Sequence, residues 1–358
     1  MGPATDSIGR RPRCKALVGG TLLPGVVSVE ITHNNHFGCD TWRLGLALAD
    51  LAPPFDVGAW SHLGAADVEI LAGFADASGQ VSSWSTQIYG QVDDVLVDWR
   101  AGQMHLKGRD LAARLIDAQS GEDFVNQTSS QIAATLAARH GLTAQVAPTT
   151  TRAGTYYEID HAHVTNGGTE WDLLTWLAAR EGYDVWVQGT TLFFLPRPDP
   201  ATASPDLVYI VPWHPGLPLQ ASRALTLANT IEVTVKSWNG AAGQSIVRTV
   251  QMQPVLCDCP GKLQQYAFTV PGLTSAQALA LAQSKAADIA RAERGISLDL
   301  PGDPALTGHH LIRLRGSGTS WDQDYYADTV HKRWSEKEGF RMTIKGLNHS
   351  PRNMVVMT

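Results

Sequence analysis

The chain of 358 residues contains little cysteine: Cys14, Cys39, Cys257 and Cys259. Four cysteines in a chain of this length do not form the disulfide framework of a small secreted domain. Cys257 and Cys259 are also too close together for a C-x2-C zinc knuckle, and no second pair accompanies them. The sequence therefore predicts free thiols in a reducing cytoplasm.

Long apolar runs and an excess of basic residues are absent as well. No segment approaches the ~20 apolar residues that a membrane-spanning helix needs. Residues 1–20 contain charges but no apolar stretch typical of a secretory signal. The formal net charge of −6 differs from the basic balance of a protein that coats nucleic acid. We therefore expect no membrane span and no nucleic-acid-coating role.

Alternating apolar and polar residues predict successive β-strands in the first third of the chain. Residues 27–31 and 42–48 show this alternation, and Arg-Ala-Gly at 100–102 predicts a hairpin turn. Several strands separated by turns, without a long helix, are typical of a barrel or a sandwich. We predict a first β-barrel domain with an N-terminal arm over residues 1–107.

Helical signals appear in the next region, residues 108–195. Residues 108–110 are expected to open a short helix, and Ser129 to cap a second helix that ends at Gly141. These signals predict a small α/β insert after the first β region.

The end of this insert carries a third helix followed by a tight hairpin. Thr169 and Asp172 form a capping-box pattern, and Gly182 is expected to end the helix. Alternating residues on both sides of Gly189 and Thr190 predict the hairpin. We expect the helix to pack onto the hairpin through three tryptophans, Trp171, Trp176 and Trp186.

Proline separates this insert from a second β region. Residues 196–222 hold seven of the 19 prolines, a density that neither a helix nor a central strand tolerates. We predict a Pro-rich linker over 196–224 and a second β-barrel domain over 225–358, with one helix and a C-terminal tail. Thr274 and Gln277 are expected to cap that helix and Gly295 to end it. The predicted fold is mainly β, with two tube-like β-barrel domains flanking a small α/β domain.

One motif suggests a catalytic metal. His36-Phe37-Gly38-Cys39-Asp40 resembles the first zinc motif of lysostaphin-type peptidoglycan peptidases, and His163 in an H-x-H could supply another ligand. Two histidines and one aspartate would leave a coordination position open for water. However, the two motifs lie about 120 residues apart, whereas the zinc domain of those peptidases is compact. We therefore expect His33 and His36 to be turn residues.

Other candidate sites are weaker. Residues 316–320 are glycine-rich but lack the lysine of a phosphate loop, which favours a hairpin turn. His309 and His310 begin a predicted strand without a partner at metal-ligand spacing. The sequence predicts no catalytic residues, no cofactor and no metal, apart from the alternative set His36, Asp40 and His163.

Four segments together resemble one family, the baseplate hub proteins of phage tails. This group includes late control D proteins, Mu-like and T4-like hubs, and the N-terminal part of type VI secretion spike proteins. The segments are an early strand-turn-strand, a hairpin leading through Gly-Arg-Asp-Leu into a helix, the capped helix with its hairpin, and the closing strands: residues 34–50, 89–117, 169–195 and 302–347.

The resemblance implies a structural protein rather than an enzyme. Hubs of this family form trimers in which each subunit contributes two similar barrels to a pseudo-sixfold ring. The implied partners are two further copies of the chain, the tail tube protein or a tube-terminal ring, the spike protein and other baseplate proteins. DNA would pass through the ring only in transit. The implied location is the tail tip of a virion, after assembly in the host cytoplasm.

Two alternatives remain open from the sequence. One is a tail-associated zinc peptidoglycan hydrolase that uses His36, Asp40 and His163. The other is the hub of a type VI-like injection system.

Overall fold

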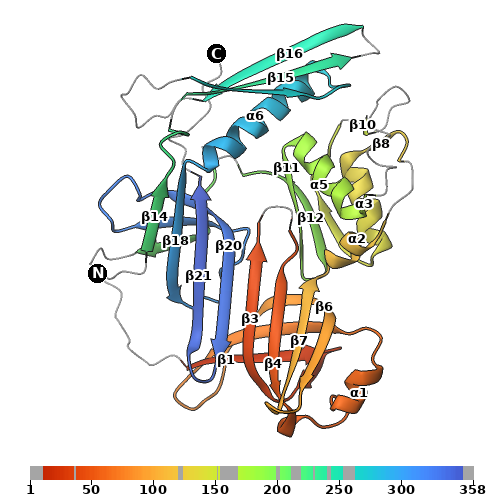
Figure 1. Ribbon diagram of the computed structural model, residues 1–358, viewed down its shortest axis with the longest axis vertical. Helices are drawn as coiled ribbons and strands as arrows, with labels where there is room; N and C mark the ends of the chain where they lie inside the picture. Colours follow the sequence, from red (N-terminus) through yellow and green to blue (C-terminus); the bar gives the residue numbers. More distant parts are fainter. Residues whose placement is uncertain are drawn as a thin grey trace.

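The computed structural model describes residues 11–35, 38–119, 124–150, 152–153, 168–198, 202–210, 219–228, 230–239, 243–252 and 263–349. The fold is mainly β, as the sequence predicts, and most strands belong to one large sheet (Figure 1). None of the helices formed by these residues is long and apolar enough to cross a membrane.

The large sheet runs without interruption through both predicted β regions. Its strand order is β14 (Leu219–Arg223), β18 (Arg294–Pro301), β21 (Gly339–Asn348), β20 (Asp324–Ser335), β3 (Val26–Asn34), β4 (Thr41–Ala47), β7 (Gln103–Asp110), β6 (Ser85–Asp98), β5 (Asp67–Ala75), β1 (Arg11–Val18) and β2 (Thr21–Leu23). On a side branch, β19 (Leu311–Arg315) pairs with β20, and β13 (Leu207–Ile210) pairs with β19. A 3-10 turn (Leu48–Asp50) and α1 (Val57–His62) lie between β4 and β5.

The junction of the two β regions is the antiparallel pair β20–β3. Thr329 lies opposite Asn34 and Ser335 opposite Ser28, so residues about 300 positions apart in the chain are hydrogen-bonded neighbours. Trp334 and Phe340 from the C-terminal strands are buried in the same core as Val29 of β3. The predicted division into two barrels stays a prediction, and the two β regions are one sheet at this junction.

Alternation along the strands separates the core from the surface. In β3 the buried residues Val29, Ile31 and His33 alternate with exposed or half-buried ones, and β21 repeats the pattern from Phe340 to Asn348. Because successive side chains point to opposite faces of a sheet, one face covers the apolar core and the other is polar. The alternation predicted for residues 27–31 therefore identified the buried face of β3, and β21 shows the same alternation in the structure.

The α/β insert follows β7. Its elements are α2 (Ala113–Asp117), β8 (Gln127–Thr128), α3 (Ser129–Arg139), β9 (Thr143–Val146), β10 (Arg152–Ala153), α5 (Glu170–Glu181), β11 (Tyr183–Gln188) and β12 (Thr191–Pro196). The Thr169–Asp172 capping box and the left-handed Gly182 that ends α5 are both present, as predicted. The helices cover one face of a three-stranded sheet in the order β11-β12-β9.

Two predicted helix starts in the insert are wrong by a few residues. Residues 108–110 belong to β7, because their backbone pairs with β4 and β6, and α2 begins only at Ala113. The N-cap of α3 is Thr128 rather than Ser129, since Thr128 and Gln131 make the reciprocal bonds of a capping box.

The prediction for the three tryptophans holds only in part. Trp171 is buried in the core of the insert and Trp176 packs against it. Trp186 lies on the opposite face of β11, where its ring stacks on Phe193 at 4.8 Å. The reason is strand alternation: Val185 and Val187 occupy the face that meets the helices, so the residue between them points away.

The Pro-rich segment contributes strands to the large sheet. In its described part, β13 pairs in parallel with β19, and β14 pairs with β18. Its assignment as a domain boundary stays a prediction.

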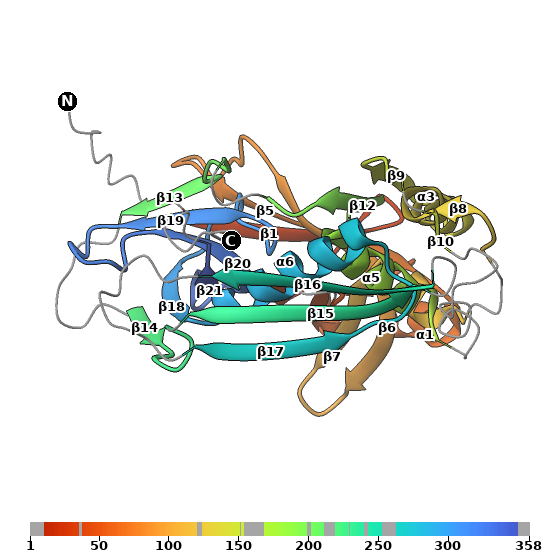
Figure 2. The ribbon, with the colours of Figure 1, turned by 90° about the horizontal axis from the view of Figure 1, so that it is seen from above.

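A second helix-and-sheet unit follows the Pro-rich segment. Helix α6 (Ser275–Arg291) packs against a three-stranded sheet of β15 (Ile231–Asn239), β16 (Gln244–Met252) and β17 (Gln264–Thr269) (Figure 2). Thr274 and Gln277 cap α6 as predicted, but Gly295 lies within β18 and does not end the helix.

A partly buried ionic network attaches the insert to the rest of the molecule. Arg197, just after β12, donates to Asp184 of β11 at 2.7 Å and to Asp288 of α6 at 2.6 Å. The hydroxyl of Tyr326, on β20, donates to the other oxygen of Asp184 at 3.3 Å. The Arg197 side chain is only 10% exposed, and removal of one partner from such a pair leaves a charge with little compensation from water. These bonds therefore fix the insert against both α6 and the large sheet.

The close passage of β7 over Trp42 provides a test of the packing. A Cβ atom added at Gly108 would overlap the carbonyl oxygen of Gln91 and the Trp42 ring. We expect Gly108→Ala to lower the free energy of unfolding by about 1–3 kcal/mol, the usual cost of overpacking. Chemical denaturation measures this. Gly64→Ala is the matched control, because a Cβ there meets open space; an equal effect of the two substitutions would contradict the packing.

Candidate functional site

A polar pocket of about 420 Å³ lies where the large sheet, the β11–β12 turn and the loop before β19 meet. We call it the junction pocket. Its lining residues are His33, Asp40, Glu69, Thr86, Gln87, Ile88, Tyr89, Asp110, Val187, Gln188, Gly189, Thr190, Thr307 and His309. The set brings together three regions that are far apart in the sequence, and it contains two histidines and two buried or half-buried aspartates.

His33 and Asp40 form a hydrogen-bonded pair at one side of this pocket. His33 Nδ1 donates to Asp40 Oδ2 at 2.6 Å, and the backbone N–H of Asn34 donates to the other carboxylate oxygen at 2.8 Å. The pair fixes the orientation of the imidazole ring. Within the described part of the chain, His33 Nε2 has no hydrogen-bond partner.

Asp110 is buried beside this pair. It accepts hydrogen bonds from the backbone N–H groups of Asp40, at 3.0 Å, and Ala112, at 2.9 Å. Burial raises the pKa of Asp110 well above its ordinary value, and the negative charge of Asp40 raises it further. The neighbouring carboxyl groups of Asp40 and Asp110 therefore have different partners: Asp40 accepts a hydrogen bond from an imidazole, and Asp110 accepts, among the described residues, only from backbone N–H groups.

His309, in the loop before β19, also lines the pocket. Its ring stacks on Trp186 of the insert with 4.6 Å between centroids. Burial lowers the pKa of His309 to about 4, so the imidazole is neutral at pH 7. The stack is a direct contact between the insert and the loop that precedes β19.

Lys332 is a second buried charge near the pocket. Its ammonium group donates to Gln87 Oε1 at 2.6 Å, and Gln87 donates in turn to the carbonyl oxygens of Ser85 and Pro304. Burial lowers the pKa of Lys332 to about 8. This network ties β20 to β6 across the interior of the molecule.

Of the three residues proposed as zinc ligands, His36, Asp40 and His163, the structure describes only Asp40. Asp40 is bonded to His33, whereas His36 and His163 lie outside the described residues. Among the residues that the structure describes, no group of three or more His, Cys, Asp or Glu side chains is placed to hold a metal ion. Cys14 and Cys39 are free thiols, and Cys257 and Cys259 also lie outside the described residues.

Two interpretations of single histidines need correction. His33 is a buried residue of β3 rather than a turn residue, because it pairs with Val330 of β20. His309 lies in the loop before β19, which begins at Leu311. Alternation in residues 27–33 places His33 on the same face as Val29 and Ile31, and this signal could have indicated its burial.

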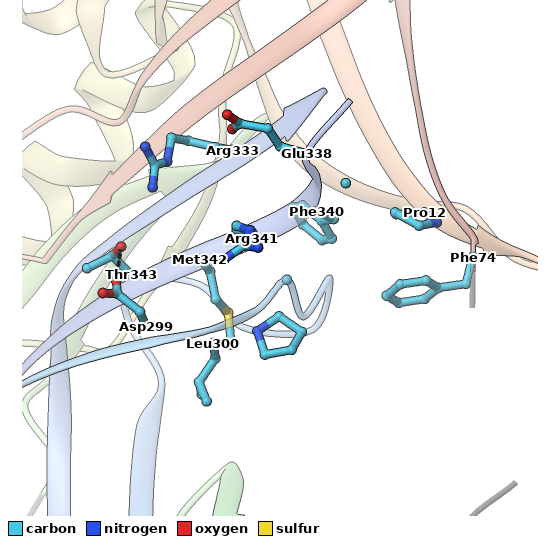
Figure 3. Close-up of a pocket in the computed structure, with 13 residues that line it drawn as sticks. Pro12, Phe74, Asp299, Leu300, Arg333, Glu338, Phe340, Arg341, Met342 and Thr343 are labelled. Carbon is cyan, nitrogen blue, oxygen red and sulfur yellow. Dashed lines mark hydrogen bonds between the residues drawn. The ribbon is translucent and has the colours of Figure 1, made fainter. Parts of the chain in front are cut away.

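A larger groove of about 740 Å³ lies at the far end of β21 (Figure 3). Its apolar surface includes Phe74, Phe340 and Met342. Its charged lining residues are of both signs: Arg333, Arg341, Asp299 and Glu338. In Figure 3 these side chains come from strands of both β regions. Among the described residues that line this groove, no buried hydrogen-bonded pair is comparable to His33 and Asp40 of the junction pocket.

Comparison with solved structures gives full-length matches to tail proteins. The tail protein from Neisseria meningitidis MC58 is 15% identical, with a TM-score of 0.67 over 94% of this chain and 97% of that chain. The prophage MuSo2 43 kDa tail protein from Shewanella oneidensis is 14% identical, with a TM-score of 0.64 over 94% and 98%. No protein-family model and no curated protein sequence matches the chain.

A type VI secretion component has a similar structure. The Escherichia coli c3393 protein, described as similar to the T4 tail proteins gp27 and gp5, is 10% identical, with a TM-score of 0.58 over 96% of this chain and 79% of that chain. At these identities the likeness concerns the fold. The chain therefore has the fold of phage tail proteins and their type VI relatives, which confirms the resemblance seen in the sequence at the level of fold.

The lowered pKa of His309 predicts that the stability of the protein changes with pH. Its folded-state pKa lies below the unfolded value of about 6.5, so the unfolded chain takes up the proton first as the pH falls. The contribution of the neutral His309 side chain to the free energy of unfolding is complete above about pH 6.5 and is lost as the pH falls toward 4. We expect His309→Phe, which keeps an aromatic ring against Trp186, to reduce the loss of unfolding free energy between pH 7 and 5 by up to about 1.4 kcal/mol per pH unit.

Denaturation midpoints at several pH values measure this effect. His62→Phe is the control, because His62 is exposed at the end of α1 and should leave the pH dependence unchanged. A His309→Phe variant with the same pH dependence as the unsubstituted protein would show that folding does not lower the pKa of His309.

Proposed function

We propose that the chain is a structural subunit of the baseplate hub of a phage-type tail. Three copies form a pseudo-sixfold ring that joins the tail tube to the central spike and surrounds the DNA exit channel. The observation that carries the proposal is the match of nearly the whole chain to nearly the whole of two tail proteins. A shared single domain would instead match only a part of each chain.

The continuous sheet supports this role. A ring subunit that presents two similar β regions needs them held at a constant angle, and the β20–β3 pair does this with backbone hydrogen bonds. The buried polar side chains also support a structural role. Lys332 donates a hydrogen bond to Gln87, and Gln87 donates to the carbonyl oxygen of Pro304, so both side chains hold parts of the fold together.

Exposed apolar residues on the β6–β7 hairpin provide a surface for assembly. Trp99 is 72% exposed at the turn, and Val95 and Leu96 on the adjoining strand are 40% and 51% exposed. Large exposed apolar side chains that cluster on one element are typical of protein interfaces. We assign this hairpin to a contact between subunits or with another baseplate protein.

The hub of a type VI-like injection system is the second candidate. The observation in its favour is the similarity of the fold to the c3393 protein. The same ring would then carry a spike without a DNA channel. The neighbouring genes distinguish the two systems, because a phage tail is encoded with capsid and terminase genes.

Images of isolated tails test the hub directly. We expect averaged density at the tail tip to show a threefold ring into which three copies of the chain fit, below a sixfold tube. Antibody labelling against the chain should mark the same end of the tail. A protein that is absent from intact particles, or present there as an isolated monomer, would refute the hub assignment.

The proposed contact at the β6–β7 hairpin can be tested by substitution of Trp99. We expect Trp99→Ser to reduce incorporation of the chain into particles severalfold, while its thermal unfolding is unchanged because the side chain is exposed. Leu225→Ser is the matched control, since Leu225 is also 72% exposed but lies after β14. Quantitative immunoblots of purified particles measure incorporation. Normal incorporation of Trp99→Ser, or an equal loss with Leu225→Ser, would remove the hairpin from the interface.

A further inference from the structure

The groove at the far end of β21 combines an apolar lining with charges of both signs, and we call it the β21 groove. In Figure 3 its apolar side chains lie around one space: Phe74, Leu300, Phe340 and Met342. Two anions and two cations lie exposed at its rim: Asp299, Glu338, Arg333 and Arg341. Its volume of about 740 Å³ is within the range of pockets that enclose drug-sized ligands, so the groove has room for a large side chain.

The turn of the β6–β7 hairpin presents a large side chain of matching chemistry. Trp99 is 72% exposed, and its neighbours Asp98 and Arg100 are exposed as well. Asp98 Oδ1 accepts a hydrogen bond from the backbone N–H of Ala101 at 2.9 Å, which fixes the shape of the turn. The three residues 98–100, which we call the Trp99 turn, therefore place an aromatic ring between one anion and one cation.

The Trp99 turn and the β21 groove are complementary in apolar surface and in charge. The indole ring matches the apolar lining, and tryptophan is among the residues most enriched at the energetic centres of protein interfaces. Asp98 matches the two arginines of the rim, and Arg100 matches its two carboxylates. An apolar centre inside a rim of paired opposite charges is the usual anatomy of a specific protein interface.

The Trp99 turn is too far from the β21 groove of its own chain to enter it. In the large sheet, β20, β3 and β4 lie between β21 and β7. Four strand spacings of about 4.8 Å separate β21 from β7 by roughly 19 Å, which is more than a tryptophan side chain can reach. In Figure 2 the β6–β7 hairpin projects from the body of the molecule, away from β20 and β21. The turn can therefore fill this groove only on another molecule.

We propose that the Trp99 turn of one copy of the chain inserts into the β21 groove of a second copy. The inference rests on the proposed hub function, and it names the surface that receives the exposed hairpin. Turn and groove are different surfaces of one chain, so the contact is head-to-tail and every copy supplies one of each. Head-to-tail contacts repeat until a ring closes, whereas a twofold contact uses the same surface on both copies and ends at dimers.

Cysteine cross-linking of the purified full-length protein at high concentration tests the proposal. The double variant W99C/L300C places one thiol in the turn and one in the groove lining of every copy. We expect a short bis-maleimide to give covalent dimers and trimers on denaturing gels, because each copy is joined to the next. The matched control is L225C/L300C, since Leu225 is also 72% exposed but lies after β14. The control should stay monomeric, as should the unsubstituted protein with its native cysteines.

Exchange of the charges gives a second, independent measurement. We expect R100E to weaken self-association severalfold in sedimentation experiments, because the new carboxylate faces those of the groove rim. The variant D299K/E338K should weaken it similarly, and the combination of all three substitutions should restore it, because opposite signs face each other again. The three substituted side chains are exposed, so thermal unfolding should remain unchanged.

Three results would overturn the proposal: no covalent trimer from W99C/L300C, equal cross-linking in the control, or no recovery in the charge-exchanged combination. Cross-linking of L300C to a different baseplate protein in purified particles would also overturn it, because another molecule would then fill the groove. A threefold ring at the tail tip without cross-linking of W99C/L300C would refute this inference and leave the hub function intact. Covalent trimers of a chain that is absent from particles would support the contact and refute the hub.

Discussion

The hydrogen-bonded pair β20–β3 is the interaction on which the rest of the structure depends. It joins residues near the start of the chain to residues near its end, so that two β regions separated by an insert become one sheet. Once this register is set, Trp334 and Phe340 enter the core beneath β3, and Lys332 reaches Gln87 of β6. A shift by one residue would turn the apolar face outward and bury charged side chains such as Arg333 and Glu30, which the cost of burying charge forbids.

The junction pocket marks the place where the insert meets this sheet. The contact is made largely by polar and aromatic groups: the stack of His309 on Trp186, and the bonds of Asp184 with Arg197 and Tyr326. Such groups are geometrically demanding, because each unmade hydrogen bond of a buried polar atom costs free energy. The insert is therefore held in one orientation, which suits a subunit whose proposed function is to hold a shape.

The two faces of the large sheet differ in their contribution to the protein. The apolar face gives the subunit its stability, and the exposed face carries charge in an order that only the register determines. The exposed turn at Trp99, between β6 and β7, provides the surface proposed for assembly. The similarity to tail proteins concerns the fold, and the charges and exposed residues belong to this chain.

The sequence by itself determined the local structure. Capping boxes at Thr169 and Thr274, the left-handed Gly182, and the alternation in β3 and β21 depend on neighbours within a few residues, and each could be predicted. Where competing partners came from other strands, prediction failed: residues 108–110 joined β7, and Trp186 turned away from its helix. Only the tertiary structure placed His33, Asp40, Asp110 and His309 around one pocket and aligned Arg333 of β20 with Glu30 of β3. Those arrangements depend on strand register between distant segments, which local propensities do not encode.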